Sequence, residues 1–416
     1  MKNTSRSSFT LILLLGGLAT VCPFAIDLYL PAFSRIAADF GTTIARVGLS
    51  LSSYFIGLSA GQLFYGPILD RFGRKRPVFA GLVLFLFASI GCAFSGSIEA
   101  LVAFRALQAL GGCAGQVGSM AMVRDFFPPR ESAKIFSLLM LVISVSPLFA
   151  PSIGGAVTAA WGWRAVFGVL AGLVLAILLA ATFFLPPPAA PDPTVQLRPG
   201  SIARGYVAIL RERRFVTYCF SGALSFSGLF VYLAASPLLF IKLHGVGERQ
   251  YAGIFALIAM GFIGLSQLNV VLIRRFESAR ILRVGMMIHV ALSVAFFLRT
   301  CVGDPGLYEL VAFFFLYLGC AGVIGPNGSA LTLAPFTRNI GSASAMMGFI
   351  QMGLGGMTSA VVGLLNASAP LPIAAILAAL PVVALGILMM GSRGFGPLPE
   401  DGGRDADRPA PVFTGH

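Results

Sequence analysis

Charged side chains are scarce in this sequence. Of its 416 residues only 11% are Asp, Glu, Lys or Arg, while 57% are hydrophobic. A soluble domain carries about 25% charged residues, so secreted, cytosolic and nucleic-acid-binding proteins are excluded. A bilayer-spanning helix needs about 20 apolar residues, and twelve of them would use roughly 240 residues. The composition therefore predicts an all-α polytopic membrane protein.

Residues for metal, redox and covalent chemistry are also few. The three histidines are far apart, and no cysteine belongs to a CxxC pair, so we expect no metal site and no cofactor. A membrane-embedded enzyme would need clustered nucleophiles, carboxylates or metal ligands, and we reject that class. The sequence has no GxxxxGK[ST] loop, which ATP-driven transport would need, and no repeated filter residues, which a channel would need. We therefore reject both of these classes. We expect the cysteines to be small buried hydrophobes: Cys22, Cys92, Cys113, Cys219, Cys301 and Cys320.

Long apolar runs follow one another along most of the chain. The first continues to Pro31 without a small-residue cleavage site, so we interpret it as a retained span rather than a signal peptide. Twelve spans are predicted, near residues 9–31, 44–69, 78–96, 99–123, 134–158, 164–185, 215–241, 251–273, 284–303, 310–333, 341–366 and 371–391.

The stretch between residues 186 and 214 divides these spans into two sets of six. It opens with PPPAAPDP, which cannot form a helix. We expect an N-terminal six-helix bundle over 1–185, a cytoplasmic linker over 186–214 and a C-terminal six-helix bundle over 215–391. The tail over 392–416, rich in Gly, Pro, Asp and Arg, is expected to be disordered.

The distribution of Lys and Arg predicts the orientation. With the N-terminus inside, cytoplasmic segments hold about 22 of the 29 basic residues and the opposite side about six. This bias places both termini in the cytoplasm, and it explains the net charge of +13 without a nucleic-acid partner.

The two halves indicate a transporter built from repeats. They resemble each other after their second spans, with DRFGRKR at 70–76 and RRFESAR at 274–280; the second copy has lost the Asp and the Gly.

Two charged residues lie well inside the spans. Asp27 is in the first span and Arg105 in the fourth, and an intramembrane charge indicates function by default. At about 1.5 Å per residue, both lie roughly 6–9 Å below the outer surface, so they could face each other across a central cavity. There Asp27 would exchange protons. The alternatives are that Asp27 caps its helix in water and that Arg105 extends to the surface.

Two further segments combine charges, glycines and prolines. The loop GPILDRFGRKR, residues 66–76, places an acid among four cations at a tight turn, and its glycines permit positive φ. SPLFAPSIGG, residues 146–155, permits a bend and close helix contact in the membrane; generic helix packing is the alternative.

These segments, with Arg105 and Gln108 in RALQALGG, resemble the three signature motifs of the major facilitator superfamily. IDLYLP, VRDFFP (123–128), GWRAVF (162–167), IGPNGSAL (324–331) and GSASAMMGFIQ (341–351) narrow the similarity to its Bcr/CflA drug-resistance subfamily, over residues 20 to 390. Ala109 and Ala150 stand where many relatives have glycine.

The resemblance implies a proton-driven drug exporter of the bacterial inner membrane, working by rocking of two six-helix bundles. It makes Asp27 the proton-coupling site and Arg105 the coupling arginine. The implied cytoplasmic gate is Gly66, Asp70, Arg71, Gly73 and Arg74. The implied antiporter motif is Pro147, Pro151, Gly154 and Gly155.

A single embedded carboxylate gives little to hold a dication, so we predict mainly neutral or weakly polar antibiotics as substrates. Polar residues within apolar spans are candidates for the cavity wall: Tyr29, Tyr54, Gln62, Gln108, Tyr232, Asn327 and Gln351. For each the alternative is an ordinary interhelical hydrogen bond.

Export or proton-coupled uptake of a small metabolite is the competing function. The expected partners are drugs, protons and the lipid bilayer, and the expected state is a monomer.

Overall fold

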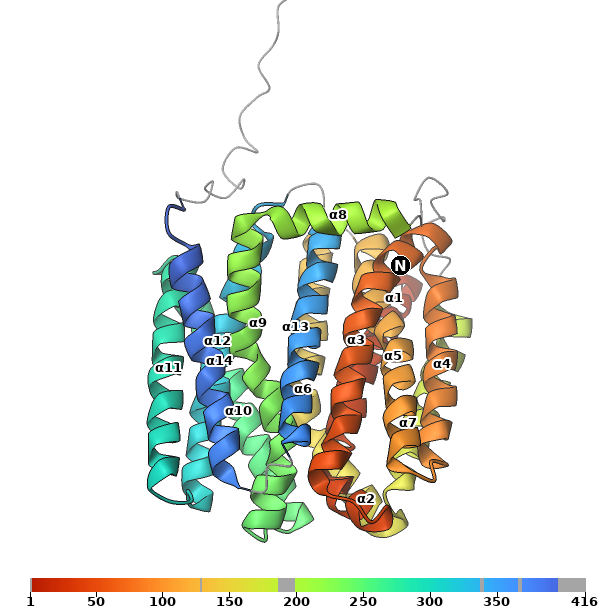
Figure 1. Cartoon of the computed structure of the whole chain (residues 1–416). Coiled ribbons are helices and arrows are strands. Elements are labelled where there is room, and N and C mark those ends of the chain that lie inside the picture. The colour runs from red at the N-terminus through yellow and green to blue at the C-terminus, as the bar shows by residue number, and fades with distance from the viewer. Residues whose placement is uncertain (1, 128, 186–198, 337–339, 366–368, 396–416) are drawn as a thin grey trace, which may run out of the picture.

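The structure is a computed structural model that describes residues 2–127, 129–185, 199–336, 340–365 and 369–395. Every regular element in these ranges is helical, and the long helices stand side by side (Figure 1). Among the described residues, eleven helical segments are long and apolar enough to cross a membrane. A further long helix, α6, covers the predicted fifth span. The all-α fold of twelve spans is confirmed.

The helices of the first half follow the predicted spans within a few residues. They are capped as soluble helices are: the side chains of Thr43 and Ser97 accept hydrogen bonds from the amides of Arg46 and Ala100, both at 3.2 Å. The first half contains α1 (Lys2–Asp27), η1 (Leu30–Ala32), α2 (Phe33–Asp39), α3 (Ile44–Phe72), α4 (Lys75–Ala93), α5 (Ile98–Phe126), α6 (Pro129–Trp161) and α7 (Arg164–Phe184).

The second half repeats this order, and its first span ends in a short π-helical segment, η2. It contains α9 (Arg213–Ser236), η2 (Pro237–Leu243), α10 (Glu248–Leu272), α11 (Ser278–Val302), α12 (Leu307–Leu333), α13 (Ile340–Leu364) and α14 (Pro370–Gly391).

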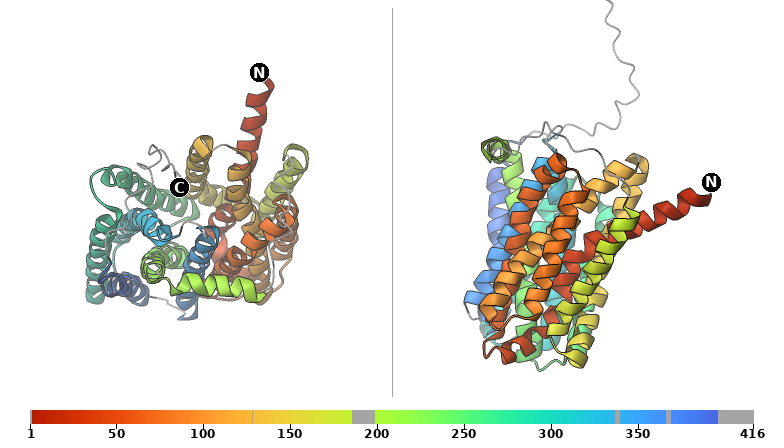
Figure 2. Two further views of the ribbon diagram at one scale, coloured as in Figure 1. Left: turned by 90° about the horizontal axis from the view of Figure 1, so that it is seen from above. Right: turned by 90° about the vertical axis from the view of Figure 1, so that its right-hand side faces the viewer.

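The two halves lie side by side as two bundles, and the N-terminal end of α1 extends away from them (Figure 2). They meet mainly where α3 packs on α13 and where α6 packs on α10. The helix α8 (Pro199–Arg211) lies across one end of the molecule (Figure 1). We call that end the α8 face.

Small residues bring α3 and α13 close together. The hydroxyl groups of Ser52 and Ser359 lie 2.8 Å apart, and Ser59 donates to the carbonyl of Phe349 at 2.8 Å. A β-carbon at Gly356 would lie 2.9 Å from Cγ1 of Ile56. The two halves therefore touch through serine hydroxyls and backbone, as small residues allow in membranes.

The linker differs in part from the expectation. Residues 186–198, which include the proline run, lie outside the described residues, but the remainder forms the helix α8. The hydroxyl of Tyr206 donates to the carbonyl of Leu63 on α3 at 3.0 Å. Ile209 is buried in a cluster with residues of α9 and α13, including Phe215 and Ile350. The linker thus contacts both halves, because its second part is amphipathic.

The expected disordered tail begins with described residues. Phe395 packs against the ring of Tyr218 at 5.8 Å, and the guanidinium groups of Arg213 and Arg214 lie 5.4 and 5.2 Å from its ring. The rest of the tail, residues 396–416, lies outside the described residues.

The expectation that all six cysteines are buried is only partly confirmed. Four cysteines are buried, whereas Cys320 is partly exposed and Cys301 is exposed on α11.

We predict that Gly356→Leu weakens the contact between α3 and α13. Overpacking typically costs about 1–3 kcal/mol, so the melting temperature of the detergent-purified protein should fall. Gly386→Leu, on α14 with open space around its α-carbon, is the control and should leave it unchanged. An equal effect of both variants would contradict this packing.

Candidate functional site

Arg105 on α5 lies in an aromatic cage inside the first half. Its side chain is fully buried, and its guanidinium carbon lies 4.1 Å from the ring centre of Tyr54, 4.7 Å from Tyr29 and 5.9 Å from Phe167. A desolvated cation–π contact contributes about 2 kcal/mol or more. The alternative, that Arg105 extends to the surface, is therefore wrong.

The polar contacts of Arg105 lead to neutral groups. It donates to Oε1 of Gln108 at 2.5 Å, and Nε2 of Gln108 donates to the hydroxyl of Ser89 on α4 at 2.7 Å. Its Nε and Nη2 atoms have no hydrogen-bond partner among the described residues. The cage thus holds a cation with two nitrogens that have no described hydrogen-bond partner. Ser89, absent from the sequence prediction, anchors Gln108.

Asp27 ends α1 and is 5% exposed. The hydroxyl of Ser146 on α6 donates to its carboxylate at 3.2 Å. The element that follows Asp27, η1, contacts α10 of the second half, and α6, which carries Ser146, packs on α10 as well. This carboxylate therefore lies near the boundary between the two halves.

Asp27 and Arg105 form no ion pair with each other in the described structure, and whether they face each other across a cavity stays a prediction. In the described part of the chain, Asp27 contacts Ser146, while Arg105 contacts Tyr29. Tyr29 follows Asp27 by two residues, and residues two apart in helical backbone point to nearly opposite sides. The position of a residue along its helix gives its depth in the membrane but not the direction in which its side chain points.

The other cavity candidates fall into two groups. Gln62 and Gln351 are partly buried, on α3 and α13, and Gln62 lies against Gly348 where these helices meet. Asn327 is 2% exposed and donates to Oδ1 of Asn269 on α10 at 2.6 Å. Asn327 thus makes an ordinary interhelical hydrogen bond, which was the alternative to a place in the cavity wall. Its partner, Asn269, was not predicted.

A buried histidine in the second half was also not singled out. His289 on α11 lies 2.8 Å from the hydroxyl of Ser225 through Nδ1, and its ring centre is 4.2 Å from that of Tyr317. Its Nε2 has no described partner. A single histidine in an apolar span carries no sequence pattern that could have indicated this contact.

The predicted gate loop lies at the α8 face. Gly73 ends α3 with a φ of 77°, which favours glycine, and Nε of Arg74 forms an ion pair with Asp125 of α5 at 3.0 Å. Gly66 has open space around it and Arg71 is partly exposed, while the side chain of Asp70 lies outside the described ones. Asp125, from the VRDFFP segment, was missing from the predicted gate.

The predicted antiporter motif lies within α6. Pro147 and Pro151 are inside this helix, and Gly154 and Gly155 are buried. A β-carbon at Gly154 would clash with the carbonyl of Leu28, next to Asp27. The glycine therefore allows α6 to approach the end of α1, where Ser146 meets Asp27.

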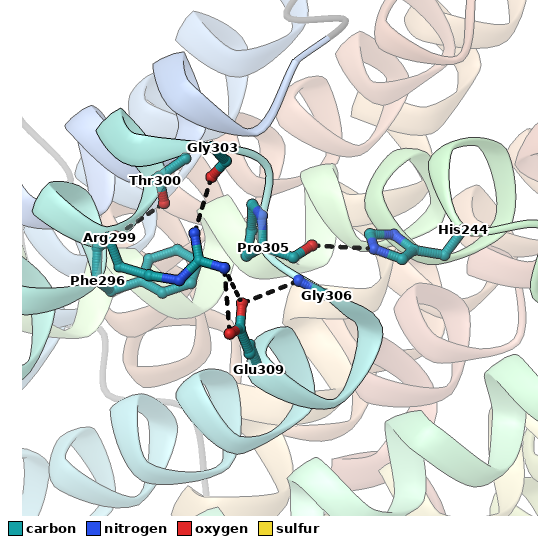
Figure 3. Close-up of polar contacts among 8 residues, drawn as sticks. All are labelled: His244, Phe296, Arg299, Thr300, Gly303, Pro305, Gly306 and Glu309. Carbon is teal, nitrogen blue, oxygen red and sulfur yellow. Dashed lines mark hydrogen bonds and ion pairs between the residues drawn. The ribbon is translucent and has the colours of Figure 1, made fainter.

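A single histidine, His244, joins the end of η2 to the connection between α11 and α12 (Figure 3). Nδ1 of His244 lies 2.8 Å from the carbonyl of Leu239, and Nε2 lies 3.1 Å from that of Pro305. A carbonyl oxygen only accepts, so a ring nitrogen that bonds to one of these carbonyls is the donor. Beside it, Arg299 and Glu309 form an ion pair at 3.0 Å.

The described side chains include no group of three His, Cys, Asp or Glu that could hold a metal ion. The chemistry available here is proton binding by Asp27, charge stabilisation by Arg105, and hydrogen bonding.

Comparison with known proteins relates the chain to transporters. Residues 15–360 match the family description Major Facilitator Superfamily. The chain is 32% identical over 382 residues to the uncharacterized MFS-type transporter YdgK of Bacillus subtilis, covering 90% of this chain and 93% of that one. It is 29% identical to a bicyclomycin resistance protein homolog of Haemophilus influenzae, covering 92% and 96%. It is also 29% identical to the multidrug resistance protein MdtL of Escherichia coli, covering 83% and 84%.

Solved structures share the fold. The D-xylose–proton symporter has a TM-score of 0.70 at 18% identity, covering 94% of this chain and 98% of its own. A point mutant of the nucleoside transporter NupG has a TM-score of 0.72 at 13% identity, covering 92% and 99%. At this level of identity, these similarities show only that the fold is shared.

We also predict that Arg105→Met does not lower the melting temperature. Replacing a buried charge by an apolar side chain of similar volume is often neutral or stabilising, and Met retains contact with Tyr54 and Tyr29. Arg105→Ala, which leaves a cavity, should destabilise by about 2–5 kcal/mol. If Met is as damaging as Ala, the guanidinium itself stabilises the fold.

Proposed function

The chain is a member of the major facilitator superfamily, and we propose that it is a proton-coupled antiporter that exports drugs across the bacterial inner membrane. As a member of this family it is a transporter rather than an enzyme. The names of two relatives, a bicyclomycin resistance homolog and a multidrug resistance protein, support drugs as its substrates.

The observation that carries the proposal is the burial of Asp27. It is the only acidic side chain buried among the described residues, and such a residue inside a membrane protein is a candidate for proton transfer. Ser146 of the first half donates a hydrogen bond to it, and the elements beside it, α6 and η1, contact α10 of the second half. Movement of the halves would change the surroundings of the carboxyl group and hence its tendency to hold a proton.

Alternating access follows from the same arrangement. Tyr29, Tyr54, Gln108 and Tyr232 are all at most 2% exposed, so we propose that a substrate reaches them only when the helices around them move. The contacts of α3 with α13 and of α6 with α10 are the surfaces on which we propose that the bundles rock.

The remaining motifs receive roles in this cycle. We assign the gate to the loop of Gly66, Asp70, Arg71, Gly73 and Arg74, with the ion pair between Arg74 and Asp125 favouring one conformation. We assign the bending of α6 to the antiporter motif, which consists of Pro147, Pro151, Gly154 and Gly155. The basic loops favour a cytoplasmic location for the α8 face.

The substrate preference follows from charge. Arg105 already places one cation in the first half and Asp27 is a single acid, so the site favours neutral or weakly polar compounds over dications. Exchange of a neutral drug for one proton moves net charge. A membrane potential of 100 mV then supplies about 2.3 kcal/mol, and each unit of pH difference about 1.4 kcal/mol.

We predict that Asp27→Asn abolishes substrate-induced proton release. Asparagine keeps the size and the hydrogen bond to Ser146 but cannot exchange a proton. Purified protein in liposomes would be challenged with a panel of neutral antibiotics while external pH is recorded. Asp304→Asn, an exposed acid without a described ion pair, is the control and should release protons as the wild type does.

Two outcomes would overturn parts of this proposal. If Asp27→Asn responds like the wild type, Asp27 is a helix-end residue and the proton site is elsewhere. If no antibiotic moves protons in the wild type, drug antiport is wrong, and a metabolite screen, the competing function, comes next.

A further inference from the structure

An apolar groove opens on the outer wall of the second half. The consecutive helices α10 and α11 both pack on α12 but hardly touch each other. Between them lies a cavity of about 370 Å³, lined by Leu268 and Leu272 of α10, Val284 and Ile288 of α11, and Cys320 of α12. Several of these side chains, including Leu268 and Ile288, are exposed, so the groove faces the surroundings of the bundle.

A cation stands at the end of the groove that lies toward the α8 face. Arg280 is the only charged residue that lines it, and its guanidinium lies 5.3 Å from the ring of Phe276. Arg274, Arg275 and Arg283 lie in the same segment, beside one acid, Glu277. In the described chain none of these four arginines has an ion-pair partner.

The corresponding place in the first half is built differently. There α3 and α4 contact each other, and a β-carbon at Gly81 of α4 would lie 3.3 Å from the hydroxyl of Tyr65 on α3. The loop arginine Arg74 is neutralised by Asp125 at 3.0 Å. In the second half α10 and α11 hardly touch, and no described acid pairs with the loop arginines, so both the groove and the unpaired cations belong to the second half.

We infer that this groove binds an anionic phospholipid. One acyl chain lies between α10 and α11 on α12, and the phosphate meets Arg280, with the neighbouring arginines around the headgroup. Arginine is suited to phosphate, and basic pockets between membrane helices bind anionic headgroups. A drug site would need several convergent polar groups, which the leucines, valines and isoleucines of this wall do not supply.

Photo-crosslinking in bilayers tests this site. The full-length protein would be reconstituted in phosphatidylcholine containing a trace of phosphatidylglycerol with a diazirine on its acyl chain, and labelled peptides would be mapped by mass spectrometry. Phosphatidylglycerol should label the segments around Leu268, Val284 and Cys320 several-fold more than a diazirine phosphatidylcholine does. Arg280→Gln should reduce this labelling about fivefold, which corresponds to ~1 kcal/mol per arginine near an anionic lipid.

Matched variants separate the site from general effects. Arg76→Gln, an exposed arginine in the first turn of α4, should leave the labelling unchanged. Val284→Trp, which fills the groove, should reduce it, whereas Val382→Trp on α14 should not; the two valines are 43% and 45% exposed. Equal labelling by the two lipids, or labelling insensitive to Arg280→Gln, would overturn the proposal.

Discussion

A buried arginine without a carboxylate partner is the constraint around which the first half is built. Arg105 is held by the rings of Tyr29, Tyr54 and Phe167 and by Gln108. These residues come from the turn between α1 and η1, from α3, from α7 and from α5 itself, so three helices and that turn must approach one point. Removing a charge from water is costly unless it is compensated. Aromatic faces and one amide stabilise the cation here while leaving it free of a permanent ion pair.

The separation of that cation from Asp27 gives the two charges different neighbourhoods. Arg105 is enclosed within one half, whereas Asp27 lies where α6 and η1 meet α10 of the second half. We propose that the carboxyl group at this boundary responds to relative movement of the halves, while the caged cation stays in one half. Gly154, which admits Leu28 against α6, connects this boundary to the helix that carries two internal prolines.

The repeat is symmetric in its helices but not in its chemistry. The first half holds both buried charges and a loop arginine paired with Asp125. The second half has the Asn327–Asn269 hydrogen bond, the contact of His289 with Ser225, and loop arginines without described ion pairs beside an apolar groove. We thus assign proton chemistry to one half, while the other offers surfaces for movement and for lipid.

The sequence by itself determined the fold class, the number of spans and their limits, because a bilayer demands long apolar helices and excludes most charges. It also singled out Asp27, Arg105 and the gate loop, since charges and glycines at such positions need a reason. Only the tertiary structure decided which way these side chains point. It separated Asp27 from Arg105, paired Arg74 with Asp125 and Asn327 with Asn269, and folded α8 against both halves. Depth in a membrane follows from position along one helix, whereas partners depend on how neighbouring helices are rotated and packed, which hydropathy does not encode.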